Sequence, residues 1–302
     1  MLTGSDFSPV TMADRELFLS HYRKFPQYHS DNTFTNMICW NPYAHYRFAY
    51  IKENLIISST IEKKTSFRMP IGPANPELLA DLLELCIREG DEAPLSLVDA
   101  NQRAWILSEY PDLSLYPDRN YFEYVYRTED LATLPGKDYL SIRRHLNRFR
   151  KNCKPVVEPI DKKNRDEVSE FLIEWCEWKN CDGEPFLAHE KEALICALSN
   201  MEELGLLGLL IRVVEKVGAI SLFEPLNEET LVVHFEKGLP DCEGIYKAIN
   251  AETAFYARER FAFINRESDM GVPGLREAKM RYHPHHMVEV WYATREDIKR
   301  VL

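Results

Sequence analysis

The sequence predicts an α+β fold with two domains in tandem, each built on a mostly antiparallel sheet flanked by helices. Three observations predict it. Helical and strand periodicities alternate along the whole chain, without a short solenoid repeat. The length of 302 residues favours about two domains. No apolar run approaches the roughly 20 residues that a membrane helix needs, which excludes an integral membrane protein.

The first half starts with a helical pattern and then changes to the period of strands. Leu17, Phe18 and Tyr22 lie on one helical face. The segments AHYRFAYI and ENLIISST, rich in aromatic and β-branched residues, are separated by a polar break and predict a β-hairpin. A helix over 77–88, a strand over 95–98, a helix over 101–110 and a strand over 121–127 complete the predicted N-terminal domain, residues 1–135.

The next predicted element is a basic amphipathic helix over 137–153. Its apolar side chains recur at i, i+4, i+7 and i+11, from Ile142 to Cys153. The basic side chains off that stripe are Arg143, Arg144, Arg148 and Lys151. We interpret residues 136–153 as a connector to a C-terminal domain over residues 154–302.

The second half has a recognisable order of elements. A strand VVEPI and helices over 164–179 and 189–204 are followed by three strands, over 207–214, 218–225 and 230–237. A helix over 243–260, a strand over 261–265, a helix over 273–283 and a strand over 287–293 complete it. Two helices, three antiparallel strands and then alternating helices and strands is the order of GNAT-type acyltransferases, so we expect a GNAT-like domain here.

The charge balance limits the partners. The 37 Lys and Arg residues against 48 Asp and Glu residues give a net charge of −11. Such an excess of acid argues against non-specific coating of nucleic acid or anionic lipid. An acidic net charge is compatible with a local basic patch, and the segment 137–154 forms such a patch in the sequence.

The cysteines and the first residues indicate the compartment. Seven cysteines are widely spaced and form no C-x-x-C pair, which favours reduced thiols over a disulfide scaffold or a zinc ribbon. The first residues, MLTGSDFSPVTMADRELF, have no basic segment followed by an apolar one, so they do not read as a secretory signal. We therefore expect a cytoplasmic protein.

The densest group of reactive side chains lies in FAFINRESDMGVPGLREAKMRYHPHH, residues 261–286. Asn265, Arg266, Glu267 and Asp269 follow an apolar strand, at the end of a strand where α/β sites commonly form. Asp269 also precedes Pro273, which suits a helix cap. A catalytic role and a capping role for Asp269 both remain open.

Two charged residues lie on apolar helical stripes. Lys279 is in line with Leu275 and Tyr282, where an ammonium group needs a partner or must reach solvent. It could bind a substrate carboxylate or phosphate oxygen, stabilise an oxyanion, or pair with an acid such as Glu267. Glu252 lies on the stripe of the preceding helix, which suits a general base and equally a structural ion pair.

Other candidates have weaker patterns. His234 shares a strand face with Glu236, and Glu224 ends the neighbouring strand, but a lone strand histidine is more often structural. His283, His285 and His286 lack a Cys/His framework, so we predict no metal site. Cys176 and Cys242 would be nucleophiles only beside a base.

Several motifs resemble one family over almost the whole chain. They are Asp31, Phe34, Asn36 and Trp40 in SDNTFTNMICW, Pro70 and Gly72 in MPIG, the basic helix DYLSIRRHLNRFRK, EGIYKAINAETA and INRESDMGVPGLREAKMRYHP. Through them the chain resembles the phosphatidylglycerol lysyltransferase C-terminal-like family. The resemblance implies two GNAT-like domains in tandem, similar to Fem-type peptidyl transferases.

The resemblance also implies a reaction, the transfer of an aminoacyl group from aminoacyl-tRNA to an amine or hydroxyl acceptor, on a lipid or a small molecule. It needs a base, donors for the oxyanion and a basic groove for the tRNA. As catalytic residues we expect Glu252, Glu267, Asp269, Lys279 and Tyr282. As substrate- and donor-binding residues we expect Asn250, Asn265, Arg266, Arg276, Arg143, Arg144, Arg148 and Lys151.

Two alternatives stay open. One is a CoA-dependent N-acyltransferase using acetyl-CoA or acyl-CoA. The Q/R-x-x-G-x-G/A motif that holds CoA pyrophosphate is replaced by KGLPDCEGIY, with Gly238 and Gly244 too far apart, which disfavours ordinary CoA binding. The other is a non-catalytic module that binds RNA or a protein through the basic helix. The N-terminal domain could be a degenerate copy that shapes the cleft.

Overall fold

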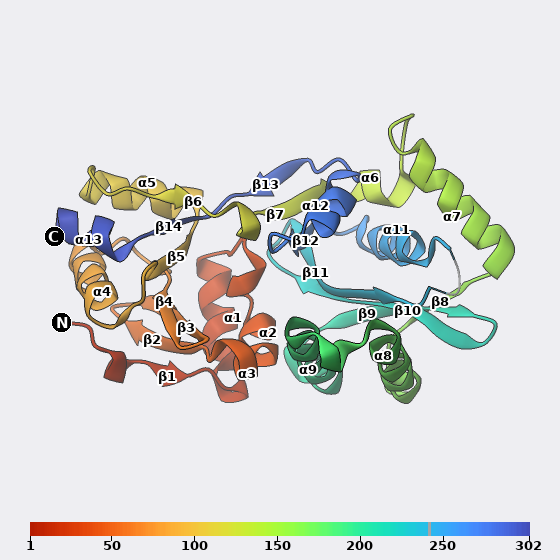
Figure 1. The fold of residues 1–302 in the computed structure, drawn as a ribbon, viewed down its shortest axis with the longest axis horizontal. Helices are drawn as coiled ribbons and strands as arrows, with labels where there is room; N and C mark the ends of the chain where they lie inside the picture. The colour runs from red at the N-terminus through yellow and green to blue at the C-terminus, as the bar shows by residue number, and fades with distance from the viewer. Residues whose placement is uncertain (241–242) are drawn as a thin grey trace. The chain divides into compact units, whose positions relative to one another are not determined.

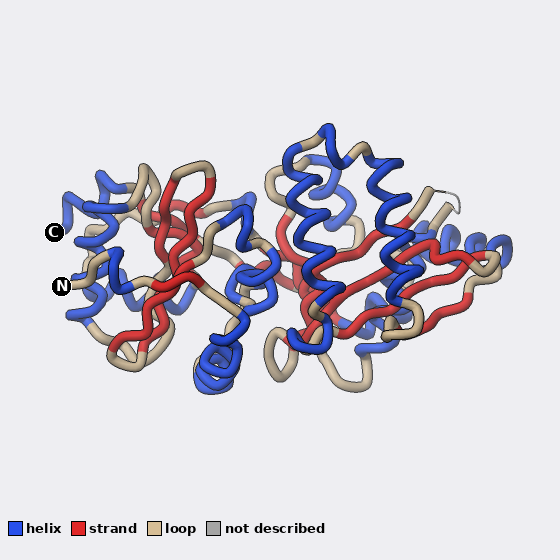
Figure 2. The backbone as a smooth tube through the Cα atoms, turned by 90° about the horizontal axis from the view of Figure 1, so that it is seen from below, coloured by secondary structure: helices blue, strands red, loops and turns tan. Residues whose placement is uncertain are grey.

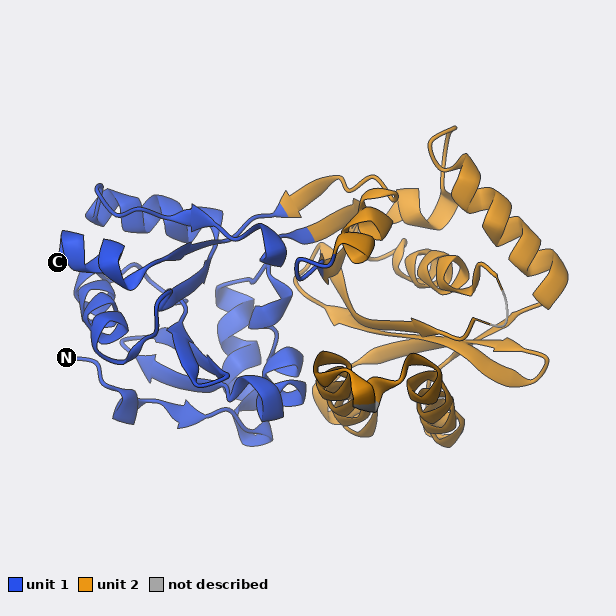
Figure 3. Cartoon of the chain, viewed as in Figure 1, with its two compact units in different colours: residues 1–123, 268–272, 288–302 blue, residues 124–267, 273–287 orange. Residues whose placement is uncertain are grey.

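The computed structural model describes residues 1–240 and 243–302 and divides the chain into two compact units (Figure 1). Cys242, one of the candidate nucleophiles, lies outside the described residues. Unit 1 comprises Met1–Glu123, Ser268–Val272 and Val288–Leu302, and unit 2 comprises Tyr124–Glu267 and Pro273–Met287 (Figure 3). The chain therefore passes from one unit to the other four times, and each unit is assembled from separate segments.

Unit 1 contains a seven-stranded mixed sheet in the order β1-β2-β3-β4-β5-β14-β6. The strands are β1 (Ser8–Pro9), β2 (Arg47–Ile51), β3 (Asn54–Ile61), β4 (Lys64–Phe67), β5 (Leu95–Val98), β6 (Tyr116–Pro117) and β14 (Trp291–Ala293). The helices are α1 (Arg15–Lys24), α2 (Phe34–Cys39), α3 (Asn41–Ala44), α4 (Pro76–Glu89), α5 (Ala100–Glu109) and α13 (Arg295–Val301). Only the β4–β5 pair of this sheet is parallel among the described residues.

Local sequence explains the first elements of unit 1. The β2–β3 hairpin turns at Lys52 and Glu53, both with positive φ, which matches the right-handed twist of the two strands. In α4, the side chain of Asn75 accepts a hydrogen bond from Leu78 N and caps the helix. The apolar stripe expected over 77–88 is buried in the core of this unit.

Unit 2 contains a second seven-stranded sheet in the order β13-β7-β12-β11-β10-β9-β8. The strands are β7 (Glu123–Arg127), β8 (Val156–Pro159), β9 (Leu207–Val213), β10 (Lys216–Pro225), β11 (Thr230–Gly238), β12 (Phe263–Ser268) and β13 (His286–Val288). The helices are α6 (Thr128–Thr133), α7 (Leu140–Cys153), α8 (Arg165–Lys179), α9 (Pro185–Ser199), α10 (Met201–Leu204), α11 (Ile245–Ala257) and α12 (Pro273–Met280).

Helices cover both faces of this second sheet. α7 and α11 lie on one face and α8 and α9 on the other (Figure 1). Figure 2 shows the sheet from below, with two helices crossing in front of its strands. The expected apolar stripe of the basic helix is buried here, since Ile142, Leu146 and Phe149 share one core with Ile245 and Ile249 of α11. The basic helix α7 therefore packs within unit 2.

The last predicted strand, over 287–293, differs from the structure. It is divided into β13, which lies in the sheet of unit 2, and β14, which pairs with β5 and β6 of unit 1. Trp291 and Ala293 of β14 pair with Val98 and Leu95. Hydropathy alone could not show this division, because an apolar segment reads the same whichever sheet receives it.

The expectation that all cysteines are reduced is corrected at one pair. Cys176, near the end of α8, forms a disulfide with Cys181. Asn180, in the left-handed region at φ +55°, reverses the chain between them and brings the two side chains together. Among the described residues, Cys39, Cys86, Cys153 and Cys196 are not part of a disulfide.

The expected α+β architecture is confirmed. Both sheets are mixed, mostly antiparallel and flanked by helices. Within residues 1–240 and 243–302, no helix combines the length and the apolar character that crossing a bilayer requires.

Candidate active site

The strands β11 and β12 separate part of the way along. They pair in parallel over three positions only, from Thr230 opposite Phe263 to Val232 opposite Asn265. Both strands continue, to Gly238 and Ser268. Beyond the last pair, side chains rather than main-chain ladder bonds join them. The polar side chains at these strand ends form the candidate site.

His234 on β11 lies between two carboxylates from its neighbouring strands. Its Nε2 is 2.8 Å from Glu224 Oε1 on β10, and its Nδ1 is 2.9 Å from Glu267 Oε1 on β12. The imidazole is 1% exposed, against 12% for Glu224 and 28% for Glu267. Because both ring nitrogens face carboxylate oxygens, both carry a proton.

The charge of His234 follows from these contacts. Burial by itself would lower the pKa of the imidazole, but the hydrogen bonds and charges of Glu224 and Glu267 outweigh it and raise the pKa to about 10. His234 is therefore an imidazolium at neutral pH. It orients the two carboxylates and does not act as a base.

A second group of polar side chains lies on the same two strands, at Glu236 of β11 and Arg266 of β12. Arg266 Nη2 is 2.9 Å from Glu236 Oε1, and the guanidinium lies 5.1 Å from the ring centroid of Tyr282. The buried amide of Asn250 on α11 lies beside both charges, with its nitrogen 3.4 Å from Glu236 Oε2. With the amide turned the other way, its oxygen takes the place of that nitrogen and accepts from Arg266 Nε at 3.1 Å instead, so the two contacts belong to alternative orientations. Three of the expected residues are thus gathered around Glu236.

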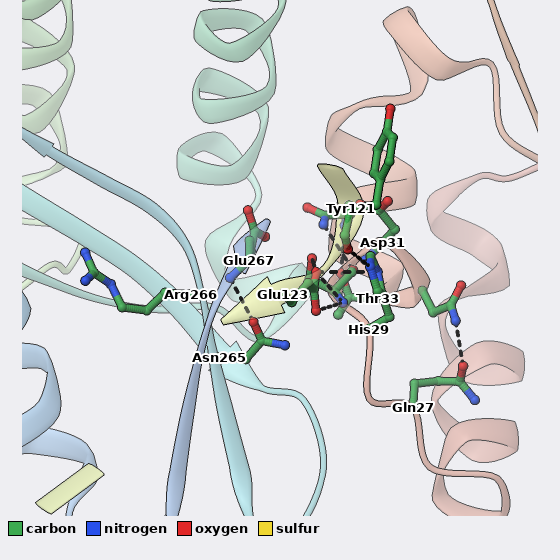
Figure 4. Close-up of polar contacts among 12 residues, drawn as sticks. Gln27, His29, Asp31, Thr33, Tyr121, Glu123, Asn265, Arg266 and Glu267 are labelled. Carbon is green, nitrogen blue, oxygen red and sulfur yellow. Dashed lines mark hydrogen bonds and ion pairs between the residues drawn. The ribbon is translucent and has the colours of Figure 1, made fainter. Parts of the chain in front are cut away.

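The main chain of Glu267 is held in an unusual conformation. Its φ is +59°, a left-handed conformation that costs free energy for a residue with a Cβ. Its N–H donates to Asn265 Oδ1 at 2.8 Å (Figure 4). Lys279 Nζ donates to the carbonyl oxygens of Arg266, at 2.5 Å, and of Glu267, at 3.1 Å. Asn265 and Lys279 therefore hold the main chain of Glu267, while His234 holds its carboxylate.

Asp269 belongs to unit 1, whereas the residues around His234 and Glu236 belong to unit 2. It is fully buried, and its Oδ1 accepts from Gly271 N at 2.9 Å while its Oδ2 lies 3.1 Å from Arg119 Nη1. These contacts close the turn before α12 and neutralise the carboxylate. They account for the burial of the Asp269 carboxylate within the segment Ser268–Val272.

Two more of the expected catalytic residues have structural partners. Glu252 forms an ion pair with Arg150 of α7 at 2.8 Å. Tyr282 packs its ring on Arg266, and burial raises the pKa of its hydroxyl to about 12, so it stays protonated at neutral pH. Arg276 is half-buried on α12.

The basic helix α7 is only partly available to a partner. Arg143 donates to the carbonyl oxygens of Leu134 and Gly136, and Arg148 pairs with Glu243 at 3.4 Å. In the described part of the chain, Arg144 and Lys151 are exposed and have no ion pair. They are the α7 cations best placed for an external phosphate.

Sequence reasoning considered His234 and Glu224 but did not place them among the site residues. The sequence contained a signal for these two residues, because an ionisable histidine interrupts an apolar strand and a glutamate lies at the end of the neighbouring strand. Their meeting with Glu267 depends on the order of three strands, which periodicity does not give. Among the described residues, no three His, Cys, Asp or Glu side chains are placed to hold a metal ion.

The arrangement suits proton transfer at a polar centre. Glu267 is more exposed than Glu224 and His234, so its carboxylate can accept a proton from a bound nucleophile. The imidazolium of His234 orients it through the contact with Nδ1. Arg266 and Asn250 offer nearby hydrogen-bond donors.

Several solved structures have a fold similar to that of this chain. A conserved protein of unknown function from Bacteroides thetaiotaomicron VPI-5482 is 34% identical, with a TM-score of 0.89 over 95% of this chain and 98% of its own. The C-terminal domain of a putative lysylphosphatidylglycerol synthetase from Agrobacterium fabrum is 12% identical, with a TM-score of 0.69 over 96% and 95%. L-PGS from Bacillus licheniformis is 13% identical, with a TM-score of 0.65 over 93% and 92%.

The Fem-type expectation for the fold is also confirmed. FemX has a TM-score of 0.56 at 10% identity, over 98% of this chain and 99% of its own. At such low identities these likenesses concern the fold alone. No curated protein is detectably similar to the chain in sequence.

The family is shown by the sequence itself. The model of the family described as phosphatidylglycerol lysyltransferase, C-terminal, matches residues 22–294. That range includes the Asn265 to Glu267 motif, His234 and the basic helix. The chain therefore belongs to the phosphatidylglycerol lysyltransferase C-terminal family.

Proposed function

We propose that the protein is an aminoacyltransferase that moves an aminoacyl group from aminoacyl-tRNA to an amine or hydroxyl acceptor. The observation that carries the proposal is the fixed Glu267 carboxylate, held by His234 on its side chain and by Asn265 and Lys279 on its main chain. Membership of a family named for lysyl transfer supports the same chemistry.

The reaction assigns a role to each group. The acceptor nitrogen or oxygen attacks the ester carbonyl of the aminoacyl-tRNA, and Glu267 takes the proton that the acceptor loses. When the tetrahedral intermediate collapses, the carbon–oxygen bond to the tRNA ribose breaks, and Glu267 returns the proton to the ribose oxygen. Donors such as Arg266 and Asn250 suit the stabilisation of the oxyanion formed in between.

The basic helix supplies the surface for the donor. Arg144 and Lys151 are exposed on α7, and tRNA phosphates attract such groups in a salt-dependent way. Since aminoacyl-tRNA is a cytoplasmic molecule, the proposal places the reaction in the cytoplasm. The proposal includes two classes of acceptor, a lipid headgroup and a small amine or alcohol.

The test is a transfer assay with the purified chain. Total tRNA is charged with one radiolabelled amino acid at a time and incubated with phosphatidylglycerol vesicles or with small amines. The proposal expects label in the lipid or the small-molecule fraction, and expects Glu267→Gln to abolish most of it. Label that stays on tRNA with every amino acid and both acceptor classes would contradict the proposal.

The same assay separates the alternatives. Transfer of an acetyl group from acetyl-CoA to an amine would favour the CoA-dependent reading. Salt-dependent tRNA binding without transfer would favour a binding module. The segment KGLPDCEGIY in place of the glycine motif that holds CoA pyrophosphate disfavours CoA as the donor.

A further inference from the structure

A groove lies between the two helices that cover the sheet of unit 2 on the face opposite α11. The helices α8 (Arg165–Lys179) and α9 (Pro185–Ser199) run side by side in front of the strands (Figure 2). Between them is a cavity of about 160 Å³. Leu172 and Leu198 in its lining are buried, whereas Ile173 and Ile195 are 59% and 47% exposed. The cavity is therefore mostly apolar and opens to solvent.

The size of this cavity fits one aromatic side chain. An engineered cavity of about 150 Å³ lined by Leu, Ile and Phe stays dry and binds one benzene ring. Ser169, Lys191 and Ser199 complete the lining here, and Ser169 Oγ donates to the carbonyl oxygen of Arg165 on its own helix. In protein interfaces, well-packed pockets of this kind hold the few anchor side chains that contribute most of the binding free energy. The cavity is therefore suited to one anchor side chain of a partner.

Acidic side chains flank the groove. Three of them lie on the same stripe of α8 as Ile173, at i, i+4 and i+11 where Ile173 is i+7, and they are Asp166, Glu170 and Glu177. All three are exposed, and none forms an ion pair with a residue that the structure describes. On α9, Glu192 is exposed as well. The edges of the groove therefore carry negative charge, of which Lys191 in the lining offsets only a part.

The charge around the groove limits its partner. The acids repel anionic lipid headgroups and RNA phosphates. A second copy of this chain offers a basic helix, α7, but the apolar stripe of α7 is buried in its own core through Ile142, Leu146 and Phe149. A separate amphipathic helix meets both requirements, because it has an apolar face for the cavity and can carry Lys and Arg beside that face.

We propose that the groove between α8 and α9 binds a basic amphipathic helix of a protein partner. One aromatic side chain of that helix enters the cavity, and its Lys and Arg side chains pair with Asp166, Glu170 and Glu177. The groove lies on the opposite face of the sheet from α11, which carries Asn250 of the candidate active site (Figure 1). It can therefore bind its partner whether or not aminoacyl transfer takes place.

The probes are two synthetic peptides of about 18 residues, since helices shorter than about 15 residues are marginal in water. Both have Leu and one central Phe on the apolar face. The first has Lys at its polar positions, and the second has Glu there. Fluorescence anisotropy measures the binding of each labelled peptide to the whole chain at several salt concentrations. We expect the Lys peptide to bind, the Glu peptide not to bind, and replacement of the central Phe by Ala to weaken binding by about 10- to 30-fold.

Matched variants test the apolar pocket. Ile173→Ser with Ile195→Ser removes its exposed walls and should weaken binding of the Lys peptide by about 30-fold or more, as the loss of an interface hot spot does. Val156→Ser with Val214→Ser removes two exposed side chains of the same unit that do not line the cavity, and it should leave binding unchanged. Because all four side chains are exposed, both variants should fold like the parent chain.

A second pair of variants tests the charge. Glu170→Lys with Glu177→Lys should weaken binding of the Lys peptide, make its dependence on salt shallower and increase the affinity for the Glu peptide. Glu228→Lys with Glu229→Lys makes the same change of net charge at the exposed turn between β10 and β11. This control should have little effect on either peptide.

Three results would overturn the proposal. The first is absence of binding of the Lys peptide to the folded parent chain. The second is an equal effect of the groove variants and their controls, which would mean that an acidic protein attracts the peptide without a specific site. The third is a different occupant. Self-association of the parent chain in sedimentation, or binding to phosphatidylglycerol vesicles, would assign the groove to a second copy or to a membrane if Ile173→Ser with Ile195→Ser abolished it.

Discussion

Lys279 fixes the main chain of Glu267. The ammonium nitrogen of this buried lysine lies 3.1 Å from the carbonyl oxygen of Glu267 and 2.5 Å from that of Arg266. The sequence suggested a carboxylate or a substrate oxygen as its partner. The partner is instead the backbone of the left-handed residue that carries the candidate base.

The proposed base can be tested by two charge-neutral substitutions. Glu267→Gln should lower the transfer rate by about 10²- to 10⁴-fold, the range for loss of a general base. It should leave the fold intact, because the amide oxygen can still accept from His234. Glu224→Gln removes the same charge from the less exposed side and should cost much less activity. Equal losses in the two variants would contradict the role of Glu267.

The buried imidazolium predicts a pH dependence of stability. The pKa of His234 is raised from its ordinary 6.5 to about 10, so its protonated form stabilises the folded state. That contribution is fully present below pH 6.5 and is lost as the pH rises through about 10. In urea unfolding, the free-energy difference between the parent chain and His234→Gln should shrink across this window. A difference that stays constant with pH would show that His234 is not charged when folded.

Lys279→Met should lower both stability and activity. The free energy of unfolding should fall by about 1–3 kcal/mol, because two partly buried carbonyl oxygens lose their donor. The transfer rate should fall as well, since Glu267 is no longer held. Lys299→Met removes an exposed lysine that pairs with Glu296 and should change neither by much. If Lys279→Met lowered only the melting temperature and kept full turnover, its positioning role would be lost.

The basic helix should control tRNA affinity. Arg144→Glu with Lys151→Glu reverses two exposed charges and should weaken tRNA binding and make its dependence on salt shallower. Lys63→Glu with Lys64→Glu makes the same change in net charge on the β3–β4 hairpin and is the control. Filter binding at several salt concentrations measures the tRNA affinity of both variant pairs and its dependence on salt. Equal effects of the two pairs would mean that α7 is not the tRNA surface.

Two glycines should respond to alanine in opposite directions. Gly244 has φ +99°, and a Cβ there would lie 3.1 Å from the carbonyl oxygen of His145. Gly244→Ala should therefore lower the free energy of unfolding by about 1–3 kcal/mol. Gly274, inside α12, has no neighbouring atom within 4 Å of such a Cβ, so Gly274→Ala should raise it by about 0.4–1 kcal/mol. Thermal and urea unfolding of the two variants measure whether the free energy of unfolding falls or rises in each.

Much of the second half could be predicted from local patterns. The basic helix, the three strands after 207 and the helix over 243–260 have strong periodicities, and the structure contains each of them with ends shifted by a few residues. The motif around Glu267 was identified because polar residues gather after an apolar strand. The roles of Asp269 and Glu252 were not decided in this way, since their partners, Arg119 and Arg150, are distant in sequence.

The sequence by itself determined the α+β class, the family and the segments that carry the polar residues, because periodicity and motifs are local properties of the chain. Only the tertiary structure decided that β13 and β14 lie in different sheets and that Glu224, His234 and Glu267 meet. Strand order depends on the free energy of whole packed layers, to which residues from every part of the chain contribute. No short window of sequence contains that information.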